Sequence, residues 1–515
     1  MRYGFVIDQR KCIGCHACTV ACKEENQVPL GVNRTWVKYI EKGTFPDTRR
    51  YFSVMRCNHC DNAPCVTICP TVALYRRPDG IVDFEGDRCI GCKSCMQACP
   101  YDALYIDPET QTAAKCHYCA HRVEVGLEPA CVIVCPVQAI VPGDLDDPNS
   151  GIARLVATQQ VAVRKPEQGT QPKLFYLGAD EAALTPAMQE AGDRYLFAET
   201  SRIPVPGGPN VAGRGQAIGG DGVDLLGMAR TVYDVAHAER PWGWKVSTYL
   251  WTKSIAAGAL LMAAIGPGWR MPGTIPSLIS LVFLALTVLL LTFDLKRPER
   301  FLYLFFKPNW RSWLVWGGWI LLAFGGLASL WFLAALRDAD RLLLALAWPT
   351  ALLALATAGY SAFLFGQAEG RDLWQSALVL PHLIVAAVTA GNAALLLPAL
   401  WLYPAGLAYY APPPTWGLSA SLVLFLLFHL LLVLSELFAK HPNQDAARAA
   451  RLIRQGTMGR RLWGGVVLGG GVLPLILLGF PAQPWCMALA AVLALGGLWL
   501  WEDIWVRAGQ ALPLS

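Results

Sequence analysis

The stretch C-I-G-C-K-S-C-M-Q-A-C-P at residues 89–100 decides the fold of this 515-residue chain. Three cysteines with two residues between neighbours can hold one iron–sulfur cubane, while a fourth, followed by Pro, reaches a neighbouring cluster. The same pattern begins at residue 12, and versions with wider middle spacings span 57–70 and 116–136. Sixteen of the seventeen cysteines lie in these four groups, so the pattern predicts four [4Fe–4S] clusters and a chain that carries electrons.

Zinc sites and disulfides are the other common uses of clustered cysteines. Zinc sites use pairs of C-x2-C, and disulfide frameworks belong to small secreted domains. Residues 1–11 lead almost directly into Cys12 without an apolar stretch, so we expect no export signal and no disulfide framework. The formal net charge of +5 is modest for 515 residues, which argues against a nucleic-acid partner.

The chain divides into parts of different composition. Residues 1–145 contain the cysteine groups in the order compact, wide, compact, wide, which predicts a tandem ferredoxin-like domain of the α+β class built around the clusters. Residues 146–245 are interpreted as a soluble extension that includes a Pro- and Gly-rich linker at 203–222. Residues 246–515 are dominated by Leu, Ala, Gly, Val and Trp and form the second domain.

The second domain contains eight apolar segments, each close to the about 20 residues needed to cross a bilayer. Gly and Ala are frequent within them, as close helix packing in lipid favours, and Trp and Tyr gather near their ends. We therefore expect an eight-helix transmembrane bundle in a bacterial inner (cytoplasmic) membrane. The expected spans are 246–266, 274–294, 312–336, 342–365, 376–397, 415–438, 462–480 and 484–506.

Lys and Arg in the loops between spans predict the orientation, because short cytoplasmic loops carry more of them. Loops on the side of the iron–sulfur domain carry twelve, against three on the opposite side, so we expect that domain to face the cytoplasm. The alternative is export together with a partner that carries a twin-arginine signal. The twelve are Lys296, Arg297, Arg300, Lys307, Arg311, Arg371, Lys440, Arg448, Arg451, Arg454, Arg460 and Arg461, and the three are Arg270, Arg337 and Arg341.

Ionisable side chains within a span are costly, so each is a candidate functional residue. Lys253, Asp294, His382 and Glu436 fall in the half of the membrane nearest the iron–sulfur domain, where a quinone would exchange electrons with a cluster. Quinone chemistry needs proton donors and acceptors beside the ring, which these residue types supply. The competing interpretations are snorkelling for Lys253, and contact with water or a loop arginine for Asp294 and Glu436.

Further candidates in the same half of the membrane are His429, Tyr249, Trp251 and Tyr360. His382 and His429 lie in different spans, which is compatible with haem in principle. Only these two histidines occur in the spans and no helix carries a paired arrangement, so we expect no haem.

Two sets of motifs make the chain resemble known families. C-N-H-C-D-N-A-P-C-V-T-I-C-P-T at 57–71 and K-C-H-Y-C-A-H-R-V-E-V-G-L-E-P-A-C-V-I-V-C-P at 115–136 are similar to the four-cluster iron–sulfur subunits of dimethyl-sulfoxide, polysulfide and related molybdopterin oxidoreductases. W-T-K-S-I-A-A-G-A at 251–259 and F-D-L-K-R-P-E-R-F at 293–301 resemble NrfD/polysulfide-reductase membrane anchors. The resemblance covers nearly the whole chain except the linker, and it implies that two subunits are fused here.

The resemblance also implies how the cysteines share clusters. In the family, the first cysteine group shares clusters with the fourth, and the second shares clusters with the third. Because this chain keeps all sixteen cysteines, four cubanes are expected rather than a three-iron cluster. The implied sets are a first quartet (Cys12, Cys15, Cys18, Cys135), a second quartet (Cys22, Cys116, Cys119, Cys131), a third quartet (Cys57, Cys60, Cys65, Cys99) and a fourth quartet (Cys69, Cys89, Cys92, Cys95).

These features together predict the electron-transfer and membrane-anchor subunit of a quinone-linked respiratory oxidoreductase. Electrons would pass between menaquinone or ubiquinone and a molybdenum or tungsten bis-pterin catalytic subunit, which the resemblance implies. With that partner in the cytoplasm, oxidation of sulfite or formate is the expected reaction. The alternative is a module of a larger proton-translocating respiratory complex, which would need a continuous polar path through both leaflets.

Overall fold

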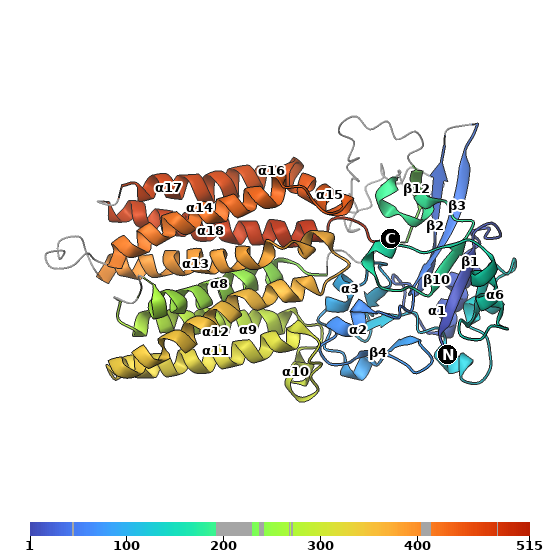
Figure 1. Cartoon of the computed structure of the whole chain (residues 1–515), viewed down its shortest axis with the longest axis horizontal. Helices are drawn as coiled ribbons and strands as arrows, with labels where there is room; N and C mark the ends of the chain where they lie inside the picture. Colours follow the sequence, from blue (N-terminus) through green and yellow to red (C-terminus); the bar gives the residue numbers. More distant parts are fainter. Residues whose placement is uncertain are drawn as a thin grey trace, which may run out of the picture.

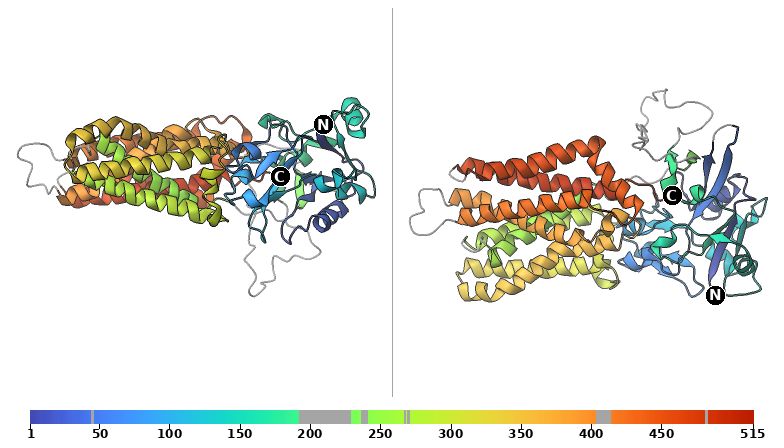
Figure 2. Two further views of the ribbon diagram at one scale, coloured as in Figure 1. Left: turned by 90° about the horizontal axis from the view of Figure 1, so that it is seen from below. Right: turned by 45° about the horizontal axis from the view of Figure 1, so that its top comes forward.

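The computed structural model divides into a mixed α/β head and a helical bundle, joined end to end (Figures 1 and 2). This arrangement confirms the predicted fold class. The expected linker at 203–222, and Arg270, lie outside the described residues. The structure describes residues 1–43, 46–191, 229–235, 241–266, 268, 271–402, 414–480 and 483–515.

Two four-stranded sheets frame the head. The first has the order β8-β1-β10-β9, in which β1 (Tyr3–Asp8) is antiparallel to β8 (Ile140–Asp144) and parallel to β10 (Leu174–Leu177). The second has the order β11-β12-β2-β3 and contains the hairpin of β2 (Thr35–Lys42) and β3 (Arg49–Arg56). The other strands are β4 (Leu74–Arg76) paired with β5 (Val82–Phe84), β6 (Leu104–Ile106) paired with β7 (Ala113–Lys115), β9 (Val161–Ala162), β11 (Gln189–Ala191) and β12 (Ala229–Tyr233).

Short helices connect these strands and carry many of the cysteines. Most begin or end at a cysteine group, so their lengths are set by the distance between ligands. They are α1 (Ala17–Glu25), α2 (Pro64–Ile68), α3 (Ser94–Ala98), α4 (Ala120–Val123), α5 (Ala130–Ile133), α6 (Gly151–Thr158), α7 (Glu181–Leu184), η1 (Gly86–Arg88), η2 (Pro166–Gln168) and η3 (Pro186–Met188).

The central strand β1 shows why the first sheet forms. Phe5 and Ile7 pack into the core that also contains Cys18 and Cys131, whereas Val6 packs into a separate core with Ile152. Successive side chains of a strand point to opposite faces of its sheet, so these residues cover both faces of β1. A strand that is buried on both faces is expected to be a continuous apolar run, as F-V-I is.

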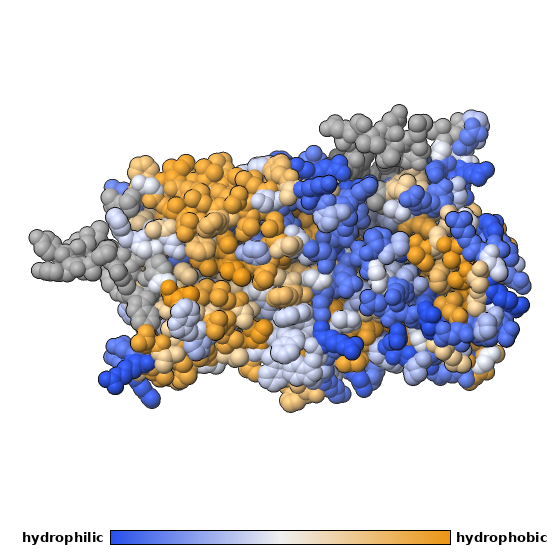
Figure 3. Space-filling view, viewed as in Figure 1, coloured by the Kyte–Doolittle hydropathy of each residue, from blue (hydrophilic) through white to orange (hydrophobic). Residues whose placement is uncertain are grey.

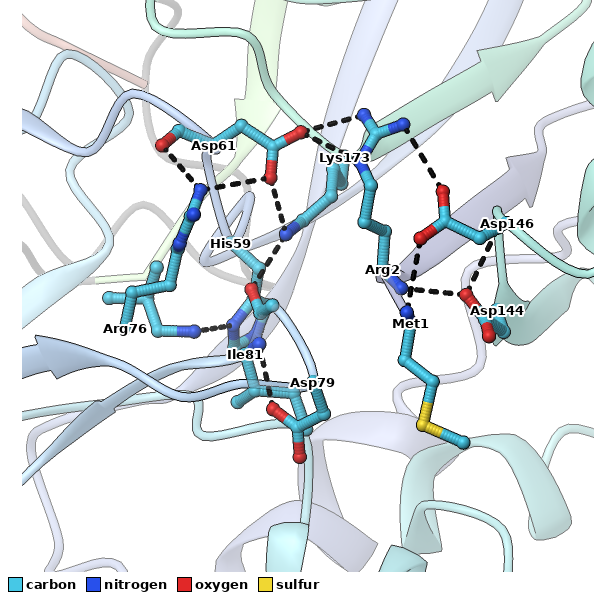
Figure 4. Close-up of polar contacts among 12 residues, drawn as sticks. Met1, Arg2, His59, Asp61, Arg76, Asp79, Ile81, Asp144, Asp146 and Lys173 are labelled. Atoms are coloured by element: carbon cyan, nitrogen blue, oxygen red, sulfur yellow. Dashed lines mark hydrogen bonds and ion pairs between the residues drawn. The ribbon is translucent and has the colours of Figure 1, made fainter.

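Residues 146–191, predicted as part of a soluble extension, contribute β9 and β10 to the first sheet and β11 to the second. A polar network ties this segment to the second cysteine group (Figure 4). The buried Lys173 places its Nζ 3.0 Å from Asp61 Oδ1 and donates a 2.6 Å hydrogen bond to the Gly80 carbonyl. Arg2 Nη2 lies 2.6 Å from Asp61 Oδ2, so the buried charges are paired rather than left at a large desolvation cost.

Eight helices among the described residues are long and apolar enough to cross a membrane, so the chain is a multi-pass membrane protein. Their outer surface is hydrophobic, in contrast to the largely hydrophilic head (Figure 3). The seventh span joins α16 (Gly456–Arg460), the π-helix η9 (Arg461–Val472) and α17 (Leu473–Leu478). The other spans are α8 (Trp244–Ile265), α9 (Thr274–Asp294), α11 (Trp313–Leu336), α12 (Asp340–Gly366), α13 (Val379–Leu402), α14 (Pro414–Phe438) and α18 (Pro484–Gly509).

Helices α8 and α13 form the centre of the bundle and touch backbone to backbone. A Cβ atom added to Gly258 would lie 1.8 Å from the Ala387 carbonyl oxygen, and one added to Gly391 would lie 2.2 Å from the carbonyl carbon of Gly258. Small residues allow such an approach, which favours helix association in lipid through close van der Waals contact.

Loops at one end of the bundle hold the head by hydrogen bonds to the backbone of the cysteine loops. Lys296 N donates to the Gly91 carbonyl at 3.2 Å, and Asn309 Nδ2 donates to the Cys69 carbonyl at 2.7 Å. The head and the bundle therefore dock through the cysteine loops themselves. Short helices in this region are η6 (Pro298–Arg300), α10 (Tyr303–Phe306), η7 (Asp372–Gln375) and α15 (Gln444–Arg454).

Candidate iron–sulfur site and membrane site

The four C-x2-C turns share one backbone conformation. The residue before the second cysteine has a positive φ in each turn, namely 70° at Gly14, 45° at His59, 68° at Gly91 and 63° at Tyr118. The left-handed turn directs backbone N–H groups towards sulfur, and Gly91 N lies 3.4 Å from Cys89 Sγ. Such N–H groups stabilise the negative charge of a thiolate that binds iron.

Helices place the later cysteines of each compact group. Cys18 and Cys95 lie in the first turns of α1 and α3, one turn after the C-x2-C turn. Cys22 is still within α1, whereas Cys99 ends α3 and is followed by Pro100. Because Pro cannot continue a helix, the chain turns away there.

Three of the four quartets each line one cavity. The second quartet lines one cavity, the third quartet a second and the fourth quartet a third. Each cavity combines cysteines from two groups that are distant in sequence. The structure thus brings together the same sets of cysteines that the resemblance assigns to one cluster each.

The first quartet lies at the surface of the head. Cys12 and Cys135 pack beside Cys18 at the edge of one core, and Cys15 is exposed. Burial and the neighbouring thiols of Cys135 and Cys15 raise the pKa of Cys12. This quartet is the one that an external partner can approach most closely.

The donor sets fit iron–sulfur clusters. Burial raises the pKa of the Cys99 and Cys119 thiols to about 11 and that of Cys92 to about 12. Such thiols become thiolates at neutral pH only when a metal supplies positive charge. No group of three or more His, Cys, Asp or Glu side chains in the described ranges is arranged to hold a single metal ion.

Electrostatic interactions between thiols of different quartets give the sequence in which the quartets follow one another from the surface of the head to the membrane domain. Each quartet has at least one thiol within electrostatic reach of a thiol in the next quartet. The pairs are Cys18 and Cys131 for the first and second quartets, Cys116 and Cys57 for the second and third, and Cys65 and Cys95 for the third and fourth.

The fourth quartet adjoins the membrane domain. Trp242 Nε1, just before α8, donates a 3.2 Å hydrogen bond to the Cys92 carbonyl. Lys93 Nζ lies 2.8 Å from Asp294 Oδ2 at the end of α9. Asp294, which was predicted as a quinone-site residue, thus forms an ion pair with Lys93 of the head.

His382 and His429 meet inside the bundle. Their ring centroids are 4.9 Å apart, and the ring of Trp501 stacks on His382 at 5.3 Å. In the described part of the chain, His382 Nε2 and both ring nitrogens of His429 are buried without a hydrogen-bond partner. Buried polar groups in native proteins nearly always have partners, so these nitrogens are candidates to bind a hydrogen-bonding ligand.

Lys253 and Glu436 lie in separate polar contacts. Lys253 Nζ donates to the Ala358 carbonyl at 2.9 Å and to Ser361 Oγ at 2.7 Å, and it lies 4.7 Å from the centre of the Tyr360 ring. Glu436 Oε2 accepts a 2.8 Å hydrogen bond from Ser376 Oγ. The hydrogen bonds described do not join the four predicted membrane residues into one cluster.

The sequence interpretation missed Glu502. This carboxyl is buried in α18 and interacts electrostatically with the Lys253 ammonium. Its neighbour Asp503 accepts from Arg461 and Arg507 at 2.5 and 2.8 Å. The signal was present, since two acids occur within the apolar run W-L-W-E-D-I-W at 499–505.

A cysteine-rich head on a multi-pass membrane domain defines the class of protein, an iron–sulfur electron-transfer subunit fused to its membrane anchor. The protein belongs to the polysulphide reductase NrfD family, which matches residues 234–511. Residues 48–145 match a 4Fe-4S dicluster domain, and residues 10–26 match a 4Fe-4S binding domain. These matches confirm the predicted fusion.

The head is also similar to subunits of several reductases. It is 48% identical over 194 residues to the B subunit of tetrathionate reductase from Salmonella typhimurium, covering 37% of this chain and 78% of that subunit. It is 45% identical over 179 residues to the B component of polysulfide reductase from Wolinella succinogenes, covering 34% and 93%. It is 37% identical over 227 residues to the arsenate respiratory reductase iron–sulfur subunit ArrB of Shewanella sp., covering 34% and 96%. These relatives support an oxidoreductase role.

Proposed function

We propose that this chain carries electrons one at a time between a catalytic subunit and membrane quinone, through four [4Fe–4S] clusters bound by the four quartets. The observation that carries the proposal is the order of the quartets, which runs from the surface of the head to the membrane domain. The names of the relatives denote single subunits of reductases, which supports a separate catalytic subunit. The catalytic subunit in this proposal contains a molybdenum or tungsten bis-pterin.

The catalytic subunit docks, in this proposal, beside the first quartet. Ile13, Val20 and Ile133 are each more than half exposed. Ile13 lies two residues before the exposed Cys15, and Val20 and Ile133 lie in α1 and α5, which pack against each other. Exposed apolar side chains gathered in one place favour a protein interface.

Purification of the complex through a tag on this chain tests the catalytic partner. We expect a large subunit to copurify with stoichiometric molybdenum or tungsten and to oxidise sulfite or formate. A copurifying subunit without either metal would contradict this part of the proposal. Replacing Ile13 with Asp should release the partner while the clusters of this chain are retained.

The quinone headgroup binds, in this proposal, beside His382 and His429. A neutral imidazole carries one N–H donor, so His382 and His429 can each donate one hydrogen bond to a quinone carbonyl oxygen through a ring nitrogen that has no partner in the protein. The Trp501 ring offers a flat apolar surface next to them. Lys253 and Glu436 are proposed as further proton donors, whereas the ion pair of Asp294 with Lys93 supports a role in holding the head.

Alanine at His382 or His429 tests the quinone site. Loss of a proton donor should slow oxidation of the reduced clusters by a menaquinone analogue by about 10²-fold. Thr389→Val is the matched control, because Thr389 is buried in the same helix and its hydroxyl donates only to the Val385 carbonyl of that helix. Unchanged rates in both histidine variants, with all clusters present, would remove these residues from the site.

The head faces the cytoplasm in this proposal. Arg297 and Arg300 donate to carbonyls of the head, so their charges are also explained by docking. Independent support comes from the basic loop at 439–455, because Arg460 and Arg461, predicted as loop residues, lie in the seventh span. An epitope inserted between Leu30, which is 91% exposed, and Gly31 tests the orientation. The epitope should react with antibody only after spheroplasts are lysed, and reaction in intact spheroplasts would contradict the cytoplasmic orientation.

A further inference from the structure

Arg56 is a buried cation placed between two quartets. It is the last residue of β3 and is 1% exposed. Its Nη1 donates a 3.2 Å hydrogen bond to Cys131 Sγ, and its guanidinium lies 4.6 Å from the centre of the Phe5 ring. Its Nε and Nη2 are buried without hydrogen-bond partners in the described structure.

Lys115 is a second buried cation of the same kind. It ends β7 and is fully buried. Its Nζ donates to the carbonyl oxygens of Val82 and Cys116, the latter at 2.8 Å. Within the residues that the structure describes, neither Lys115 nor Arg56 forms an ion pair with a carboxylate.

A buried cation without a counter-charge is strongly unfavourable, because its lost hydration is not replaced. Other buried lysines of the head avoid this cost by pairing, as Lys173 pairs with Asp61 and Lys93 pairs with Asp294. Arg56 interacts electrostatically with the thiols of the first and second quartets, and Lys115 with the thiols of Cys65 and Cys116. The charge that balances them is therefore the net negative charge of thiolate-bound clusters.

Arg56 lies near the first and second quartets, and Lys115 lies near the second and third. Arg56 lies within electrostatic reach of Cys18 in the first quartet and of Cys116 and Cys131 in the second. Lys115 adjoins Cys116 in the second quartet and lies within reach of Cys65 in the third. Every electron that crosses the head along the proposed order of quartets passes both positive charges.

We propose that Arg56 and Lys115 act as fixed positive charges that raise the reduction potentials of the neighbouring clusters. The effect is strongest on the cluster of the second quartet. An electron received from a neighbouring cluster adds one negative charge to the acceptor while the donor is oxidised by one electron, and no proton needs to move. A fixed cation beside the acceptor stabilises its reduced form, because the attraction is large in a medium of low dielectric constant. This inference rests on the proposed assignment of clusters to quartets.

Redox titration followed by electron paramagnetic resonance tests the inference on the full chain. Arg56→Met and Lys115→Met should each lower the potential of at least one cluster by the equivalent of a tenfold shift in electron partition, about 59 mV. Arg56→Lys keeps the positive charge, so its cluster potentials should stay close to those of the unaltered chain. Arg164→Met is the matched control, because Arg164 is equally buried and bonds to the carbonyls of Leu184 and Leu514.

Several outcomes would overturn the inference. Four intact clusters with unchanged potentials in Arg56→Met and Lys115→Met would do so, as would an equal shift in Arg164→Met or a full shift in Arg56→Lys. If a methionine variant loses iron, the pair Lys115→Arg and Lys115→Gln replaces it, and equal potentials in that pair would reject the proposal. Fewer than four clusters in the unaltered chain would instead reject the proposed function.

Discussion

At the level of single residues, the ion pair of Lys93 and Asp294 links the fourth quartet to the end of α9. The two groups are 2.8 Å apart, with side chains 8% and 16% exposed. Because the pair is largely buried, removing one partner leaves a charge without compensation. Lys93→Met should therefore weaken docking of the head by about 2 kcal/mol, a value reduced from that of fully buried pairs to allow for solvent screening.

A double-mutant cycle measures this interaction. The temperature at which the cluster absorbance disappears should fall in Lys93→Met and in Asp294→Leu, and the double variant should lose less than the sum of the two. Strict additivity would show that the two residues act independently. The change leaves all sixteen cysteines in place, so iron content serves as the control.

Residue-level prediction succeeded where the chemistry depends on local spacing. The cysteine groups needed only a fixed spacing and a following Pro, as in residues 89–100. Arg56 was missed because its role depends on neighbours that are distant in sequence, whereas Glu502 was missed although its apolar surroundings at 499–505 are a local signal. Arg56 ends an ordinary strand, and only the fold brings it to Cys131. The membrane histidines were predicted as candidates, but their contact with Trp501 needed the packing of three helices.

At the level of elements, the contact of α8 with α13 is one place in the bundle where there is no room for an added atom. Gly258→Ala would place a methyl group against the Ala387 carbonyl, so the helices must separate. Overpacking of this kind should cost about 1–3 kcal/mol. When heated in detergent solution, the variant should aggregate at a lower temperature than the unaltered chain.

Gly326→Ala is the matched control for this prediction. Gly326 lies in α11, and a Cβ atom added there meets nothing within 4 Å. Alanine also has the higher helix propensity, so this variant should be as stable as the unaltered chain or slightly more stable. Equal losses in the two variants would mean that the α8–α13 contact is not specially tight.

Apolar length predicted every span, since about 20 apolar residues are needed to cross a bilayer. It did not predict the π-helix η9, which the glycine-rich run at 464–471 accommodates. It also did not predict that β9 to β12 complete the sheets of the head. Strand pairing between segments far apart in sequence leaves no local signal, and these strands are short.

At the level of the whole molecule, we expect the head to depend on its clusters for folding. The cysteines contribute to two of its cores, together with Phe5, Ile68 and Tyr101. Metal binding and folding are coupled in domains of this kind. Removal of iron with a chelator should therefore open the head to proteolysis, while the spans stay helical by circular dichroism. A protease-resistant head without iron would contradict this expectation.

The loop charges show the limit of sequence rules at this scale. Lys296, Arg297 and Arg300 counted as orientation signals, yet the structure places them against the cysteine loops, where Arg300 donates to the Gly86 carbonyl at 2.7 Å. A basic residue in a loop can be present because it binds a docked domain or because the loop faces the cytoplasm. Composition alone cannot separate these two roles.

In the proposed function, electrons cross from the surface of the head to quinone within this one chain. The most direct measurement uses the purified chain in lipid nanodiscs, with its clusters reduced by dithionite and then mixed anaerobically with a menaquinone analogue. We expect quinone to oxidise all four clusters, and His382→Ala to slow the reaction without changing the cluster content. Clusters that stay reduced in the presence of quinone, in a chain that holds all four, would contradict it.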